Sequence, residues 1–398
     1  SLPLQPLKHG ILCIPGATPA STFKLSLHDI GAPAKWIQLI FDKDAGIQRA
    51  LRPNGTTVLG PNKITEANWT SRLGEASAYP DYLDFFSSQV AAHGVSAVLE
   101  RYVFSPEANG NGSMMLVRFV GGLMHPIIQA GFGIEFGHDF VVAQGKLVAT
   151  PSYQSSFLTW CRGLGQPAVT APAGTSVMDM PAAVPEINTG LSTSMLALLR
   201  EVYESERLTP MPYEAESINP QRLAAWMRSN PERATEIRKI YSRWTFDVGD
   251  GAEPEQFAKK TEECLWQATL PLGATGKAGG KPRMNFFLMH FLTGSLFLHV
   301  VLGAVHNPMH KAQLLQTYVR LAVMFVILRG RPRIDPALVM TYPECPTPPM
   351  NANASALGVI GSRSPWFAVL NNAALHSEPH VVKSIRILHY CAQRYGQI

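Results

Sequence analysis

The sequence predicts a mainly α-helical fold: an irregular helical bundle that encloses an apolar pocket and has few or no strands. Three observations lead to this prediction. Residues 284–304 are almost continuously apolar over more than one helical face, as in a helix with protein on nearly every side. Several other segments repeat apolar residues at helical spacing. Few segments carry the signals of a strand.

The N-terminal part is expected to alternate irregular segments with short helices. Prolines break any long helix in residues 1–30, and a short amphipathic helix is expected at 36–41. Residues 82–93 predict a second amphipathic helix that ends at Gly94. Residues 97–103 then continue as another helix or as a short strand.

Residues 113–136 form the second strongly apolar helical stretch, in which Pro126 and several glycines allow a kink and close helix packing. Residues 163–193 are rich in small residues and proline, which fits a domain linker or a long loop over a pocket. We expect one helical domain over residues 1–398, with 163–193 as a long irregular loop. Further helices are expected at 194–206, 220–244, 254–270 and 312–328, with a closing hairpin of 366–376 and 379–395.

The composition is that of a compact globular protein, with 46% hydrophobic and 16% charged residues. The formal charge of +5 is spread along the chain without a Lys/Arg run, so nucleic-acid binding is not expected. Five cysteines without a CxxC pair are typical of reduced thiols in an intracellular, cytoplasmic protein. We expect no secretory signal, and the polar residues within 284–304 favour a core helix over a membrane span.

The sequence offers no convincing nucleotide-binding motif. Residues 163–168 fit GxGxxA formally, but Pro167 and the prolines after it forbid the helix that would hold a pyrophosphate. The chain also lacks a P-loop, an HExxH pair and a GxSxG elbow. We therefore expect no flavin or nicotinamide cofactor.

Twelve histidines are the remaining chemical resource. For any one of them, the simpler interpretation is a histidine that bonds to the backbone or to a neighbour. Taken together, the histidines predict more: several apolar helices that each carry one inward imidazole are expected to line a shared pocket. His376 and His380 have the i, i+4 spacing of metal ligands, but Pro379 lies between them and the signal is weak. The histidines on expected apolar helices are His125, His290, His299, His376, His380 and His389.

Six segments in the same order resemble the questin oxidase family of fungal polyketide pathways. They include GGLMHPIIQAGFGIEF at 121–136, KPRMNFFLMHFLTGSLFL at 281–298 and PHVVKSIRILHYCAQRYG at 379–396. The resemblance implies oxygen-dependent opening of an anthraquinone-type ring, described as Baeyer–Villiger oxidation. It also implies a mostly helical protein without a dinucleotide fold. The other segments are 31–53, 94–107 and 335–349.

The chain departs from the pattern of family members that resemble iron-dependent enzymes. Such members carry a histidine-rich stretch where this chain has ASTFK at 20–24, and a second histidine where it has Gln129. A site without two or more nitrogen donors would hold iron weakly. We therefore expect a cofactor-independent oxygenase with O2 as co-substrate and no metal ligands, with iron dependence as the alternative. The residues that do match the family pattern are His125, His290, His380 and Lys383.

The resemblance implies a reduced anthraquinone of chrysophanol or emodin type as the substrate, and these residues suit a mechanism for its oxidation. We expect His290 or His125 to act as general base on a phenolic hydroxyl, and the resulting anion to reduce oxygen. A ring peroxide then forms and rearranges. Lys383, His380 and Gln129 are candidate donors to the developing negative charge, although Lys383 also fits a surface lysine. The residues expected to bind the flat substrate are Gln129, Phe132, Phe287, Phe291 and Asp139.

Two other functions stay open at this point. One is an iron-dependent dioxygenase that cleaves anthraquinone rings, and the other is a non-catalytic helical protein that binds polyketides. The expected partners are a small aromatic polyketide and O2, with no nucleic acid and no membrane. Where NADPH is required, a separate quinone reductase would use it to make the hydroquinone.

Overall fold

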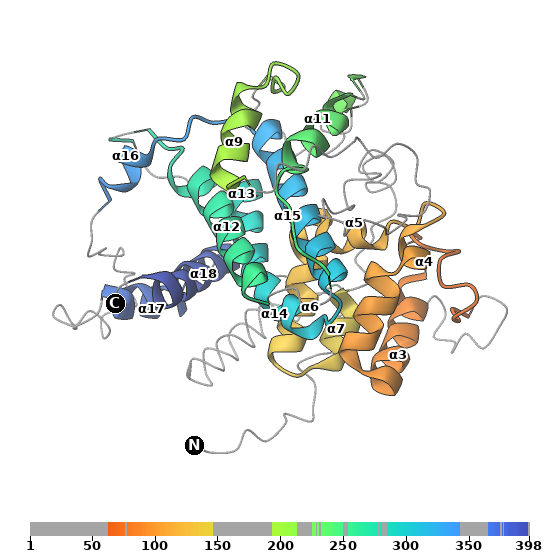
Figure 1. Ribbon diagram of the computed structural model, residues 1–398. Helices are drawn as coiled ribbons and strands as arrows, with labels where there is room; N and C mark the ends of the chain where they lie inside the picture. The colour runs from red at the N-terminus through yellow and green to blue at the C-terminus, as the bar shows by residue number, and fades with distance from the viewer. Residues whose placement is uncertain are drawn as a thin grey trace. The chain divides into compact units, whose positions relative to one another are not determined.

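The computed structural model describes residues 63–75, 78–145, 193–212, 225–249, 254–280, 285–342, 365–374 and 376–396, apart from positions 228, 231, 278 and 377. Residues 64–340 form one compact unit, and residues 1–63 with 341–398 form another, so each is described by itself. The regular elements in the described ranges are helices, which confirms the mainly α prediction (Figure 1). The enclosed pocket and the single domain stay predictions. The expected helix at 36–41 and the expected loop up to residue 192 lie outside the described residues.

The larger unit begins with helix α3 (Tyr79–Leu99), which continues directly into the π-helix η3 (Glu100–Phe104). The sequence predicts a helix end at Gly94. In the structure Gly94 has a φ of 77°, and the helix resumes beyond it instead of ending. Residues 97–103 are therefore helical and not a strand. The short helices α4 (Pro106–Asn109) and α5 (Met115–Val120) follow.

The predicted apolar helix at 113–136 is interrupted in the structure. A short 3-10 turn, η4 (Gly122–Met124), separates α5 from α6 (His125–Glu135). Pro126 lies in the first turn of α6, where backbone N–H groups have no intrahelical acceptor and a missing N–H therefore costs no hydrogen bond. Pro126 thus starts this helix and does not kink it. Helix α7 (Asp139–Gly145) packs closely on α6.

The predicted central helix at 284–304 is two helices, α13 (Phe286–Ser295) and α14 (Leu298–Ala304). Both α13–α14 and the next helix, α15 (Pro308–Leu328), are long and apolar enough to cross a membrane. In the most apolar window of each, 78% of the residues of α13–α14 and 83% of those of α15 are buried inside the protein, as in core helices. The other helices of this unit are α9 (Met195–Glu204), α11 (Glu232–Tyr241), α12 (Pro254–Gly273) and α16 (Pro336–Val339).

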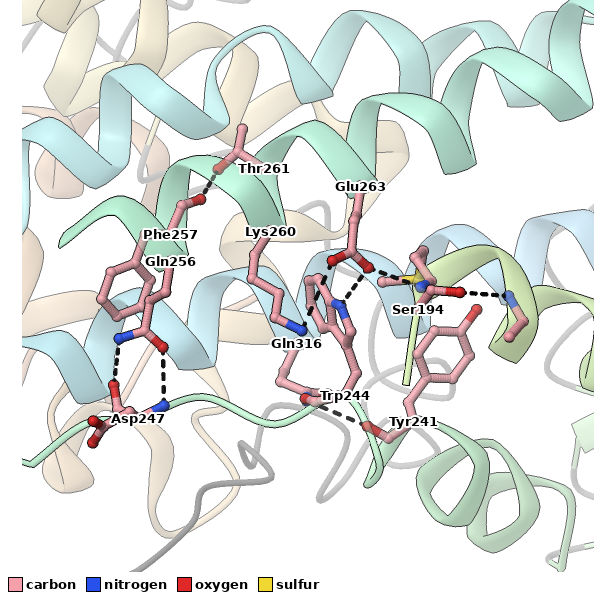
Figure 2. A network of polar contacts seen from close by, with 12 residues as sticks. Ser194, Tyr241, Trp244, Asp247, Gln256, Phe257, Lys260, Thr261, Glu263 and Gln316 are labelled. Carbon is pink, nitrogen blue, oxygen red and sulfur yellow. Dashed lines mark hydrogen bonds and ion pairs between the residues drawn. The ribbon is translucent and has the colours of Figure 1, made fainter. Parts of the chain in front are cut away.

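A network of polar contacts joins α9, α12 and α15 to the segment after α11 (Figure 2). The Glu263 carboxylate on α12 accepts hydrogen bonds from Trp244 Nε1 at 2.9 Å and from the Met195 backbone N–H at 2.8 Å. The Gln316 side chain on α15 donates to the Trp244 carbonyl at 2.5 Å. These bonds connect elements that are far apart in the sequence.

The smaller unit contains α17 (Pro365–Ala374) and α18 (Pro379–Tyr395), which pack together as the predicted hairpin. The rings of Trp366 and His389 meet between them, with centroids 5.0 Å apart. Helix α18 begins after Glu378, whose carboxylate accepts a hydrogen bond from the His380 backbone N–H at 3.0 Å.

Candidate active site

His290 lies in the middle of α13 and is only 1% exposed. Its helix begins at a fixed residue, because the Asn285 side chain accepts hydrogen bonds from the N–H groups of Phe287 and Leu288. Nδ1 of His290 lies 2.6 Å from the Phe286 carbonyl oxygen. A carbonyl oxygen can only accept, so Nδ1 carries the proton. In the neutral ring, Nε2 then holds the lone pair and is the basic nitrogen.

His125 is the first residue of α6, and its ring lies next to that of His290. The two ring centroids are 5.0 Å apart, and the ring planes are inclined by 62°. Nε2 of each ring is shielded from solvent. The structure thus brings together the two histidines that the sequence predicts as alternative bases, although 165 positions separate them.

Two glycines let α6 approach α13 and α14 closely. A Cβ atom at Gly294, one turn after His290, would lie 2.8 Å from Cβ of Met124. A Cβ atom at Gly131 would lie 2.4 Å from the ring of Phe297, between α13 and α14. Both distances are shorter than side chains tolerate, so neither position accepts a larger residue without a shift. Close backbone packing therefore brings the two imidazoles together.

Sequence reasoning missed Phe286 as an aromatic neighbour of His290. Its ring centroid lies 4.5 Å from that of His290, and the residue is 43% exposed. A signal was present, since Phe286 precedes His290 by one helical turn. The predicted substrate contacts Phe287 and Phe291 both pack on Phe325 in the core. Phe132 is buried against Phe136 and Phe297.

The predicted polar contacts Gln129 and Asp139 have different surroundings. Gln129 is buried, and its Nε2 donates to Oε1 of Gln144 on α7 at 3.0 Å. Asp139 is exposed in the first turn of α7, where its negative charge is favourable near a helix N-terminus. A role for either residue, or for the three phenylalanines, in substrate binding stays a prediction.

In the smaller unit, Lys383 and His380 lie in the first turns of α18. Lys383 is 8% exposed, so it is not a surface lysine. Burial lowers the pKa of Lys383 to about 8, and the negative charge of Glu378 partly opposes this shift. His380 Nδ1 contacts the Glu378 carboxylate. Hydrogen bonding from the His380 backbone holds the pKa of Glu378 below its ordinary value, although burial opposes this. A shared role of this pair with His125 and His290 stays a prediction.

The described residues offer no group of three or more His, Cys, Asp or Glu side chains that could hold a metal ion. The histidine pair on α6 and α13 supplies two imidazoles, whereas a non-haem iron site commonly takes two histidines and a carboxylate. A surface cavity of about 420 Å³ in the larger unit is lined by residues of α9, α11 and the segment after α9, most of them acidic, and by none of the predicted site residues.

Comparison with known proteins gives a consistent set of relatives. Residues 21–388 match the sequence model of the family described as questin oxidase-like. A questin oxidase of Aspergillus terreus is 25% identical over 365 residues, which cover 90% of this chain and 71% of the relative. The Baeyer-Villiger monooxygenase dmxR6 of a Cryptosporiopsis species is 24% identical, covering 92% and 73%. The Baeyer-Villiger oxidase mdpL of Emericella nidulans is 25% identical, covering 92% and 74%.

Proposed function

The chain belongs to the questin oxidase-like family, and from this premise we propose that it is a Baeyer–Villiger-type oxidoreductase that opens a ring of a reduced anthraquinone. Relatives named questin oxidase and Baeyer-Villiger monooxygenase support this reaction class. The substrate is an anthrahydroquinone of chrysophanol or emodin type, and O2 is the co-substrate. The proposed reaction uses neither a metal nor an organic cofactor.

One observation carries the proposed chemistry: two imidazoles lie 5.0 Å apart, and the Phe286 carbonyl holds Nδ1 of His290 in its protonated form. Nε2 of His290 is thereby prepared to take a proton from a phenolic hydroxyl. The neighbouring His125 is a second proton acceptor, or it orients the substrate. Helix packing fixes both rings before the substrate binds, which is the preorganisation that catalysis requires.

Oxygen reacts with the deprotonated substrate because an anthrahydroquinone anion readily gives up an electron. Transfer of one electron to O2 gives superoxide and a semiquinone radical, and their recombination gives a ring peroxide. Rearrangement then inserts one oxygen atom beside the carbonyl, and the other oxygen atom leaves as water. Hydrolysis of the resulting lactone gives a benzophenone carboxylate.

Lys383 and His380 are the proposed donors to the negative charge on the peroxide. The pKa of Lys383, about 8, allows an ammonium ion that can donate a hydrogen bond and also release a proton near neutral pH. Gln129 is a weaker candidate, because its amide N–H group already bonds to Gln144. Where NADPH is needed, a separate quinone reductase supplies the hydroquinone.

The test measures metal content and oxygen consumption with chemically reduced emodin, with and without a chelator. The variants are His290→Ala and His125→Ala, with His93→Ala on the exposed side of α3 as the matched control. We expect turnover without stoichiometric metal, a fall in kcat of about 10²–10⁴-fold for His290→Ala, and no change for His93→Ala. Unchanged rates in both site variants would refute the assignment of the base. Loss of activity with chelator would favour an iron-dependent dioxygenase, and quinone binding without oxygen uptake would favour a carrier.

A further inference from the structure

Three consecutive residues directly before His125 have left-handed backbone conformations. The φ angles of Gly122, Leu123 and Met124 are 57°, 57° and 64°. Glycine adopts such angles easily, but leucine and methionine do so at a cost, because Cβ approaches the backbone carbonyl. Elsewhere in the described ranges, positive φ angles of residues with side chains occur at Met114 alone and in two pairs with a glycine, Asn111–Gly112 and Gly330–Arg331.

The last residue of this turn rests on the helix that carries His290. Met124 is fully buried, and its Cβ and Cγ lie 2.8 and 2.9 Å from where a Cβ of Gly294 would stand. Gly294 follows His290 by four residues, so both lie on one face of α13. The Met124 backbone N–H also donates to the Gly121 carbonyl at 3.0 Å, which closes the turn.

From these contacts we infer that the left-handed turn Gly122–Met124 is a positioning device, which aims His125 at His290. His125 is the first residue of α6, so a change of backbone region at Leu123 or Met124 would redirect that first turn and its ring. Strained backbone of this kind persists where the surrounding structure enforces it, and it is concentrated at functional sites. The inference rests on the proposed function for its catalytic consequence, but not for its geometry.

The test replaces Leu123, which is half-buried, with residues that differ in their tolerance of left-handed backbone. Leu123→Val introduces a β-branched residue, which resists positive φ, whereas Leu123→Asn introduces one that accepts it. Met114→Val is the matched control, because Met114 has a φ of 45° directly before α5. Gly294→Ala displaces the turn from the other side through its contact with Met124.

Two readouts are measured for each variant: kcat and KM from oxygen uptake, and the nuclear Overhauser effect between the ring protons of His125 and His290. We expect Leu123→Val and Gly294→Ala to lower kcat at least about tenfold, with KM nearly unchanged, and to weaken the ring contact. Leu123→Asn should keep both the rate and the ring contact. Met114→Val should lose thermal stability but keep kcat.

The inference is overturned if Leu123→Val or Gly294→Ala, once folded, keeps the ring contact and the wild-type kcat. If Leu123→Val does not fold, Gly294→Ala decides the question, because alanine favours the helix at that position. If the wild type consumes no oxygen, the proposed function fails. The ring contact in the same variants still decides whether the turn positions His125.

Discussion

Two buried lysines show how the same side chain serves different purposes in this chain. Lys260 in the larger unit and Lys383 in the smaller unit are each 8% exposed. Burial is the main cause that lowers the pKa of both. Lys260 has compensation: its Nζ lies 3.9 Å from the Glu263 carboxylate and 4.8 Å from the ring centroid of Trp244. For Lys383 the opposing influence is the charge of Glu378, and the pKa falls to about 8.

The two sites differ in how far neighbouring groups compensate the buried positive charge. A carboxylate and an aromatic face beside a buried ammonium favour its charged form and bind it to its neighbours. A buried ammonium with little compensation gives up its proton easily, which is a property of catalytic lysines. Lys260 thus belongs to the network of Figure 2, whereas the role of Lys383 as a donor to reacting oxygen stays a proposal.

The largest effect is expected when the network loses its carboxylate. Glu263→Ala leaves Lys260 without its counter-charge and removes the acceptor for Trp244 Nε1 and the Met195 N–H. We expect the free energy of unfolding to fall by about 3 kcal/mol, with kcat of the folded protein unchanged. Urea unfolding measures the first and oxygen uptake the second. Glu262→Ala, at the neighbouring position of α12, is the control, and an equal loss in both variants would contradict this account.

Removal of Lys383 should have the opposite effect on stability. The folded pKa of about 8 lies below the ordinary lysine pKa of 10.5, so the unfolded chain binds more protons between these values. Stability of the wild type therefore rises with pH across this window. Lys383→Met should stabilise the protein by about 1–3 kcal/mol at pH 7, and this gain should disappear near pH 10.5.

Urea unfolding at pH 7 and pH 10.5 measures the effect, and the exposed Lys259→Met is the matched control. The same Lys383→Met variant should lose catalytic activity if Lys383 is a donor to reacting oxygen. A stabilised variant with full kcat would leave Lys383 as a buried lysine without a part in the chemistry.

The contrast between what the sequence predicts and what packing decides is clear in α13. Its existence and the inward direction of His290 follow from local residue types, as does the approximate extent of α18. The break between α13 and α14 does not, because no glycine or proline lies at Leu296 or Phe297. Nor does the left-handed turn before His125, since leucine and methionine disfavour it. Both features arise from tertiary contacts that a single sequence does not display.

A smaller loss of stability is expected where shape, and not charge, holds two elements together. A methyl group at Gly131 would lie 2.4 Å from the ring of Phe297, which is fully buried. Gly131→Ala should therefore lower the free energy of unfolding by about 2 kcal/mol. Gly303→Ala on α14 is the control, because a Cβ there meets nothing within 4 Å. The control should be neutral or slightly stabilising, and thermal unfolding that ranks the two variants the other way would show that this contact is not tight.

The smallest effect is expected at Glu100, a half-exposed carboxylate whose charge is compensated by neighbouring hydrogen-bond donors. The Glu100 carboxylate accepts hydrogen bonds from the backbone N–H groups of His306 and Asn307 at 2.7 and 2.9 Å, directly before α15. Burial raises the pKa of Glu100, but these hydrogen bonds outweigh it, so the pKa is lowered. The positive charges of protonated His310 and His306 lower the pKa of Glu100 further, as smaller causes than the two backbone hydrogen bonds.

Glu100→Gln should accordingly lower the free energy of unfolding by about 0.5–1 kcal/mol at pH 7. A carboxyl with a lowered folded pKa stabilises above its unfolded pKa, and this contribution is lost as the pH falls through the folded value. The difference between wild type and variant should thus shrink in acid, whereas the exposed Glu107→Gln should show almost none at any pH. If the difference does not change with pH, the glutamine side chain of the variant destabilises the protein through its hydrogen-bond geometry. The charge of Glu100 would then have no part in starting α15.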